Sequence, residues 1–222
     1  MKYLIIILSA FSCFLYSYNS KEINDFYNSY YSTNYDIKNI EDKSSQTYRN
    51  LYFLIQSKKI KDEKEKYNYL KEAINKNEDY KESDDIDYLI SVSELMNYIM
   101  YYCNVPEKIS FGSKSKDIYK TILEKDDKNF FALLGTGVGY IHAPAIAGGS
   151  SKKAFQYFNK ALINAKEKYQ KYLAYVWLSQ YYFKMEDNEN YIKYIKMSKD
   201  IYENGYLLEY AMDRNLNYEK TL

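Results

Sequence analysis

Residues 131–161 constrain the fold of this chain more than any other part of the sequence. They contain five of its seven glycines, one of its two prolines and its only histidine. Apolar residues recur at helical spacing on both sides of the glycine–proline break, so we expect two helices, 131–140 and 151–165, joined by a turn. Glycine and proline are rare elsewhere in the chain, which favours helices over a loop-rich or all-β fold.

Helical periodicity continues on either side of this pair. Hydrophobic residues make up 46% of the chain and charged residues of both signs 27%, a balance typical of one folded domain. We interpret the polar stretches 36–44, 78–85 and 104–115 as connections, with Ser115 capping the helix that follows the last of them. Further helices are predicted at residues 23–31, 48–55, 67–74, 86–103, 115–123, 172–183, 188–202 and 206–216.

The central helix pair carries the residues of a packing pattern in which small side chains let two antiparallel helices approach closely. These residues are Phe131, Leu134 and Gly135 in the first helix, and Ala154, Phe158 and Ala161 in the second. Their spacing resembles the tetratricopeptide repeat, a 34-residue helix pair with the pattern W-x2-L-G-x2-Y followed by A-x3-F. A weaker second unit begins with Tyr175, Leu178, Ser179 and Tyr182.

The best repeat units are therefore residues 129–165 and 172–202, and the two N-terminal pairs match the pattern only in periodicity. This resemblance implies an all-α, tetratricopeptide-like stack of antiparallel helix pairs (an α-solenoid). We expect about four pairs and a C-terminal capping helix, because open helical stacks need a polar cap. The family places ligand contacts on the first helices, along the concave face.

The first unit carries a seven-residue insertion between its helices. Residues 142–150 form an apolar loop that contains Pro144 and ends in Gly148-Gly149, immediately before the second helix. This stretch resembles the periplasmic T component associated with TRAP transporters, a bacterial family with similar helical repeats. The resemblance covers about a third of the chain, and the N-terminal half shows no motif of that family.

The first 17 residues are interpreted as a secretory signal peptide. Lys2 precedes an apolar run that ends at Tyr16, and polar residues follow it. We expect cleavage after Ser17, a folded domain from residue 18 to 222, and a periplasmic or secreted location in a bacterium. Three alternatives remain: a retained membrane anchor, a buried N-terminal helix, or lipidation of Cys13 in a loose lipobox. After cleavage at Ser17 only Cys103 would remain, which excludes an intrachain disulfide.

The sequence indicates a non-enzymatic protein without a cofactor. The glycines from 135 to 139 lack the G-x-G-x-x-G spacing, and residues 148–152 lack the first glycine of a P-loop. A single histidine excludes a His-rich metal site, so we expect no metal. Without residues 1–20 the basic and acidic residues balance at 30 each, which argues against nucleic-acid binding.

We therefore expect a scaffold that binds a peptide or protein partner on its concave face. The predicted ligand-binding residues are Asn129, Thr136, Tyr140, His142, Gln180 and Lys184. A functional role for His142 would be to bind a carboxylate when protonated. The alternative function is a small-molecule-binding accessory of a TRAP-type transporter, with the 142–150 loop and His142 lining a pocket. We interpret most of the thirty tyrosines as half-buried helix residues, and a tyrosine-rich binding surface as the alternative.

Overall fold

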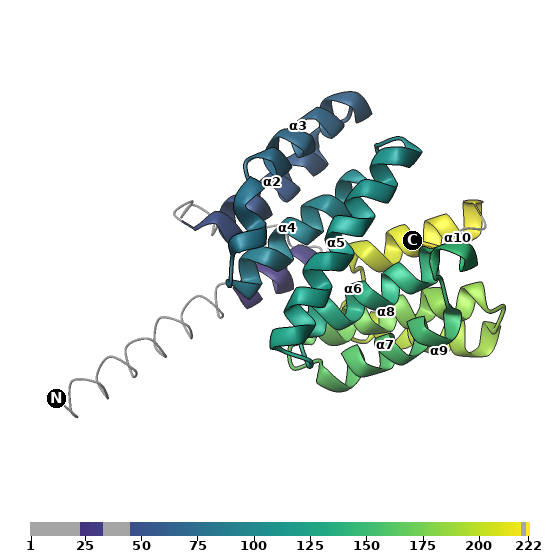
Figure 1. Ribbon diagram of the computed structural model, residues 1–222. Coiled ribbons are helices and arrows are strands. Elements are labelled where there is room, and N and C mark those ends of the chain that lie inside the picture. The colour runs from purple at the N-terminus through teal and green to yellow at the C-terminus, as the bar shows by residue number, and fades with distance from the viewer. Residues whose placement is uncertain (1–22, 33–44, 219–220) are drawn as a thin grey trace, which may run out of the picture.

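A computed structural model describes residues 23–32, 45–218 and 221–222, and the described chain is helical with no strand (Figure 1). The predicted all-α class is confirmed. Residues 23–31 are helical and come before the labelled helices. The α-helices are α2 (Gln46–Lys59), α3 (Glu63–Asn75), α4 (Ile86–Ile99), α5 (Val105–Lys125), α6 (Phe130–His142), α7 (Ser151–Asn164), α8 (Lys168–Lys184), α9 (Asn188–Lys199) and α10 (Tyr206–Tyr218). Short 3-10 helices, η2 (Glu78–Glu82) and η3 (Ala145–Ala147), lie in two of the connections.

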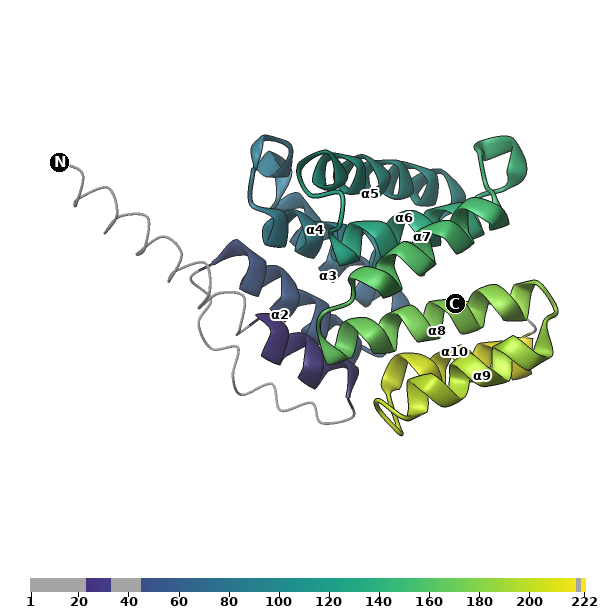
Figure 2. The same cartoon turned by 90° about the horizontal axis from the view of Figure 1, so that it is seen from below.

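Consecutive helices from α2 to α9 pack against each other and form an α-solenoid-like stack (Figures 1 and 2). The even-numbered helices also contact one another: α2 packs on α4, α6 on α8, and α8 on α10. Asn50 of α2 donates to Ser91 of α4 at 2.9 Å, and Gln180 of α8 donates to Asn215 of α10 at 3.0 Å. We call α2, α4, α6, α8 and α10 the inner row.

Polar caps define where most helices begin. The side chains of Ser45, Asp62, Asp85, Asn104, Asn129, Ser150 and Asp187 each accept a hydrogen bond from a backbone N–H in the first turn of the helix that follows. Such caps satisfy donors that have no partner within the helix. Ser150 capping α7 agrees with the predicted start of the second helix after the insertion.

The sequence interpretation of residues 104–115 as a loop is wrong, because α5 begins at Val105 and runs through them. Asn104 caps this helix, and Pro106 lies in its first turn, where the missing N–H costs nothing. Gly112 lies in the interior of this helix, next to the buried Phe111. Ser115 is therefore a buried residue within α5 and not a cap.

The helical segment 23–31 fills the space that the inner row surrounds. Phe26, Tyr27, Tyr30 and Tyr31 are all buried. The ring of Tyr27 lies 4.9 Å from Phe131 of α6 and 5.2 Å from Tyr169 of α8. The predicted first helix is confirmed. The predicted signal peptide 1–17, Cys13 and most of the 36–44 connection lie outside the described residues.

Close helix contacts explain two glycines of the central pair. A Cβ atom on Gly135 would lie 2.2 Å from the ring of Tyr119 on α5. A Cβ atom on Gly137 would lie 2.6 Å from Phe158 on α7. Both glycines lie where helices approach closely, in agreement with the packing role predicted for Gly135. None of the helices in the described part of the chain is both long and apolar enough to cross a membrane.

Candidate functional site

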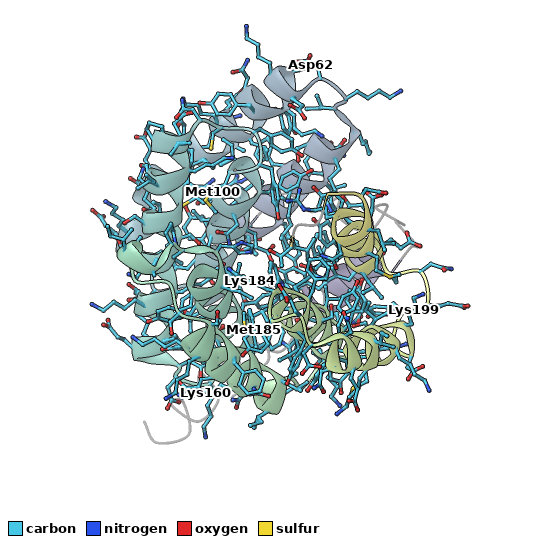
Figure 3. All side chains as sticks on the ribbon, turned by 90° about the vertical axis from the view of Figure 1, so that its right-hand side faces the viewer. Asp62, Met100, Lys160, Lys184, Met185 and Lys199 are labelled. Atoms are coloured by element: carbon cyan, nitrogen blue, oxygen red, sulfur yellow. The ribbon has the colours of Figure 1, made fainter. Side chains whose placement is uncertain are left out.

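Four side chains from three inner-row helices lie near one another: His142 and Lys184 at the ends of α6 and α8, Trp177 within α8, and Arg214 within α10. We call them the basic cluster. The imidazole ring of His142 is perpendicular to the indole of Trp177, with 5.9 Å between the ring centroids. Lys184 donates to the carbonyl of Ile141, which holds α8 against the end of α6. Figure 3 shows Lys184 on this face of the molecule.

Arg214 is held by its own neighbours and remains half-buried. Its Nε donates to the carbonyl oxygen of Thr221 at 3.0 Å, and its guanidinium carbon lies 5.7 Å from the centroid of the Tyr210 ring. A guanidinium over an aromatic ring is attracted by the electrons of the ring face. The ring of Tyr210 and the carbonyl of Thr221 thus orient Arg214 without neutralising it.

The surroundings of His142 determine its charge. Although the residue keeps an exposed surface, its pKa is lowered to about 4, mainly because the surrounding protein replaces water around the imidazole and to a smaller extent because of the positive charges of Lys184 and Arg214. The imidazole is therefore neutral at pH 7. At neutral pH the positive charge at this place therefore belongs to Lys184 and Arg214, and carboxylate binding by a protonated His142 stays a prediction.

Two tyrosines lie near Arg214 of the basic cluster, one after the end of α4 and one on α10. Tyr101 lies in the turn between α4 and α5, and Tyr210 belongs to α10. Burial raises the pKa of Tyr101 to about 12, and Tyr210 and Arg214 are among the groups whose charges act on it. Tyr101 is nevertheless 46% exposed, the only exposed tyrosine side chain in the described part of the chain. An exposed aromatic ring beside uncompensated cations is a surface suited to binding.

A second charged pair lies at the centre of the molecule, beside segment 23–31. The Nζ of Lys58 on α2 lies 3.9 Å from the ring centroid of Tyr30 and 4.3 Å from that of Tyr206. Glu94 of α4 accepts a hydrogen bond of 3.1 Å from the hydroxyl of Tyr27.

Burial moves both of these pKa values toward neutrality. The pKa of Lys58 falls to about 7, and the pKa of Glu94 rises to about 7. Both side chains keep some contact with solvent, but the surrounding protein disfavours either charge.

The predicted ligand-binding residues do not all meet at one place. Of the six, the structure brings only His142 and Lys184 together. Asn129 is the N-cap of α6, and Thr136 donates to the carbonyl of Ala132 within the same helix at 2.7 Å. Tyr140 stacks on Tyr157 of α7, with 5.6 Å between their ring centroids.

Gln180 is fully buried and not available to a ligand. It exchanges two amide hydrogen bonds of 3.0 Å with Asn215, and its Oε1 also accepts from the backbone N–H of Leu222 at 3.2 Å. The docking of α10 onto α8 covers this residue. The repeat pattern predicts that Gln180 lies on the first helix of a pair. It does not predict that α10 packs over the face of α8 that carries this residue.

Trp177 and Arg214 are the site residues that sequence reasoning missed. Trp177 is the only tryptophan of the chain and Arg214 is one of two arginines. Their rarity was the one available signal. Among the described residues no three His, Cys, Asp or Glu side chains are grouped so as to hold a metal ion.

Comparisons with protein-family models, with curated proteins and with solved structures found no match for this chain.

Proposed function

We propose that the protein is a non-catalytic, tetratricopeptide-like scaffold that binds a peptide or protein partner on its inner row. The observation that carries this proposal is the basic cluster with the exposed Tyr101 beside it. Aromatic and basic side chains that stay accessible and uncompensated are the groups that dominate binding at protein interfaces. Most other tyrosines are buried or half-buried in helix contacts.

The surroundings of His142 support binding in preference to catalysis. A histidine that acts as general base is commonly oriented by a carboxylate, which also stabilises its protonated form. His142 instead has Lys184 and Arg214 as its charged neighbours, and these disfavour protonation. A negatively charged partner would offset the positive charges of Lys184 and Arg214. A histidine that must take up a proton during catalysis is instead disfavoured by these charges.

The N-terminal sequence pattern supports a partner in the bacterial envelope, in the periplasm or at the membrane surface. Only the apolar N-terminal run, as a signal or anchor, would attach the protein to a membrane. Segment 23–31 packs into the centre of the stack, so the first helix that the structure describes would begin a few residues after the proposed cleavage site.

Affinity capture with two matched double variants tests this proposal. The inner-row variant is Tyr101→Ala with Lys184→Ala. The control is Ile163→Ala with Lys152→Ala, which removes the same kinds of exposed side chain from α7. We expect residues 18–222 of the wild type and of the control to retain the same envelope protein or peptide, and the inner-row variant to lose it. Equal retention by all three proteins would exclude the inner row as the binding surface.

A further inference from the structure

The chain gathers its rarest side chains at one place. It contains one histidine, one tryptophan and two arginines in 222 residues, against 29 lysines. His142, Trp177 and Arg214 come from three different helices. His142 and Trp177 are in ring contact, and Arg214 directly precedes Asn215, which exchanges hydrogen bonds with Gln180 one helical turn before Lys184. Nearly all basic residues of this chain are lysines, so the arginine at position 214 is unusual. Its planar guanidinium group can form two parallel hydrogen bonds to one carboxylate, which suggests a carboxylate as the ligand.

Within the residues that the structure describes (23–32, 45–218 and 221–222), the two cations of the cluster form no ion pair with an acidic side chain. Ion pairs within the described part of the chain join Lys71 to Glu107, Lys76 to Glu72, Lys120 to Glu124 and Lys125 to Asp84. Lys184 and Arg214 take part in none of them. Among the described residues, these two side chains donate hydrogen bonds to two carbonyl oxygens and, at 3.4 Å, to the hydroxyl of Tyr210. Each cation therefore keeps N–H donors for an incoming acceptor.

The two rings of the cluster add neutral donors. The indole N–H of Trp177 and the imidazole of His142 have no hydrogen-bond acceptor in the described part of the chain. Trp177 is half-buried, so its N–H is partly removed from water. Among the described residues, two cations without an ion pair and two ring N–H groups without an acceptor therefore form a set of hydrogen-bond donors suited to an anion.

The same pair of helices already holds a short stretch of peptide. Arg214 binds the carbonyl of Thr221, Gln180 accepts from the N–H of Leu222, and the Leu222 side chain is only 4% exposed. Residues 221–222 are non-helical, so the contact shows that the ends of α8 and α10 accept an irregular peptide backbone beside the cluster. This favours a peptide over a small free anion as the natural occupant.

We propose that the basic cluster is a carboxylate-binding site, in which Lys184 and Arg214 take an acidic side chain of a partner peptide while Trp177 and Tyr101 pack against its apolar neighbours. This inference rests on the proposed function and names the chemistry of the partner. Two residues of the cluster, His142 and Lys184, were predicted from the sequence as ligand-binding residues. Trp177 and Arg214 were not.

The single histidine makes the test direct. Because His142 is the only imidazole of the chain, its proton resonances in an NMR spectrum report on the cluster alone. The probe is the peptide acetyl-Asp-Glu-Leu-Glu-amide, and its isosteric control is acetyl-Asn-Gln-Leu-Gln-amide. Bound carboxylate offsets the charges of Lys184 and Arg214, so we expect saturation with the acidic peptide to raise the pKa of His142 by about one unit. The amide control is expected to leave this pKa unchanged.

Substitutions locate the effect. Lys184→Gln and Arg214→Gln are each expected to weaken binding of the acidic peptide about tenfold, as for the loss of one charge-assisted hydrogen bond. Lys152→Gln on the outer helix α7 should leave the dissociation constant unchanged. Arg214→Lys should recover part of the affinity because it restores the charge without the fork. Circular dichroism of each variant establishes that it is folded.

Three results would overturn the proposal: no shift of the His142 pKa at saturating peptide, equal binding of the amide control, or an equal effect of inorganic phosphate. Capture of an envelope partner that depends on Tyr101 and Lys184, together with no peptide-induced shift, would leave the proposed function standing and remove only the carboxylate site.

Discussion

The charged side chains in two regions of the inner row have different partners. At the centre, Lys58 lies between the rings of Tyr30 and Tyr206, and Glu94 accepts a hydrogen bond from Tyr27. At the end formed by α6, α8 and α10, the acceptors that the described residues offer to Lys184 and Arg214 are carbonyl and hydroxyl oxygens. The centre is filled by segment 23–31, whereas the end is not.

The difference shows which part of the inner row is structural and which part is available. A buried charge must be paired or neutralised to avoid a large desolvation cost, and both pKa values at the centre have moved toward neutrality. Partly exposed cations at the end retain water and tolerate the absence of a partner. Substitutions at the centre should therefore alter stability, and substitutions at the end should alter binding.

The largest effect is expected from Tyr27→Ala at the centre. This change removes a ring that is only 2% exposed and leaves Glu94 without its hydroxyl donor. We expect a loss of about 3–5 kcal/mol in the free energy of unfolding. Urea unfolding followed by circular dichroism measures it.

Tyr101→Ala, at the exposed end, is the matched control for that substitution. We expect it to cost less than about 1 kcal/mol, because much of the ring already faces water. Similar losses for the two variants would contradict the division between a structural centre and an available end.

A smaller, pH-dependent effect is expected from Glu94→Gln. The pKa of Glu94 is about 7 in the folded protein and near 4.5 in the unfolded chain, so the folded state binds more protons between these pH values. Its contribution to the free energy of unfolding therefore falls as the pH rises from about 4.5 to 7 and stays low above pH 7.

Because glutamine stays neutral and can still accept from Tyr27, the variant should match the wild type near pH 4.5 and be more stable by about 1–3 kcal/mol at pH 8. The shift of His142 is present in both proteins and cancels to first order in this difference. The shift of Lys58 does not cancel, because the charge of Glu94 raises the pKa of Lys58 and the variant lacks that charge. Urea unfolding at intervals between pH 4.5 and 8 gives the comparison. A stability difference that does not change with pH would show that Glu94 has an ordinary pKa.

Local patterns in the sequence were sufficient to predict most of the helices. The central pair lies within one or two residues of its prediction, because helical periodicity and capping are properties of neighbouring residues. The one large error, the loop at 104–115, came from treating Pro106 and Gly112 as breakers. Proline in a first turn is compatible with a helix, and the burial of Phe111 outweighs the cost of one glycine.

The site could be predicted only in part, since its residues are distant in sequence. His142 and Lys184 were named from their positions in the two repeat-like units, but Arg214 lies on α10, whose packing onto α8 is a tertiary contact. The same contact buries Gln180, which the pattern had placed on the binding surface. No local signal shows which of the charged residues in the chain will face each other.

At the available end, Lys184→Met should barely alter stability. The variant loses the hydrogen bond to the carbonyl of Ile141 but also removes repulsion from Arg214 and from any protonated His142. We expect a change within about 0.5 kcal/mol in the free energy of unfolding. Loss of more than about 2 kcal/mol on urea unfolding would mean that Lys184 is as structural as the residues of the centre.

The smallest effect is expected from salt on the pKa of His142. Crowding by the protein is the main cause of its low pKa, and salt does not change that contribution. The charges of Lys184 and Arg214 add a second contribution, which mobile ions screen because the cluster is in contact with water. Raising the ionic strength from about 0.01 to 1 M should therefore raise the pKa of His142 by a few tenths of a unit, measured from its NMR titration.

The direction of this salt effect distinguishes two descriptions of the cluster. If an unrecognised carboxylate neutralised Lys184 and Arg214, screening would leave the pKa of His142 unchanged or lower it. A rise with salt in the wild type that disappears in a variant with both Lys184→Gln and Arg214→Gln would show that the two cations act on the imidazole without compensation. That uncompensated charge is the property that separates this end of the inner row from its centre.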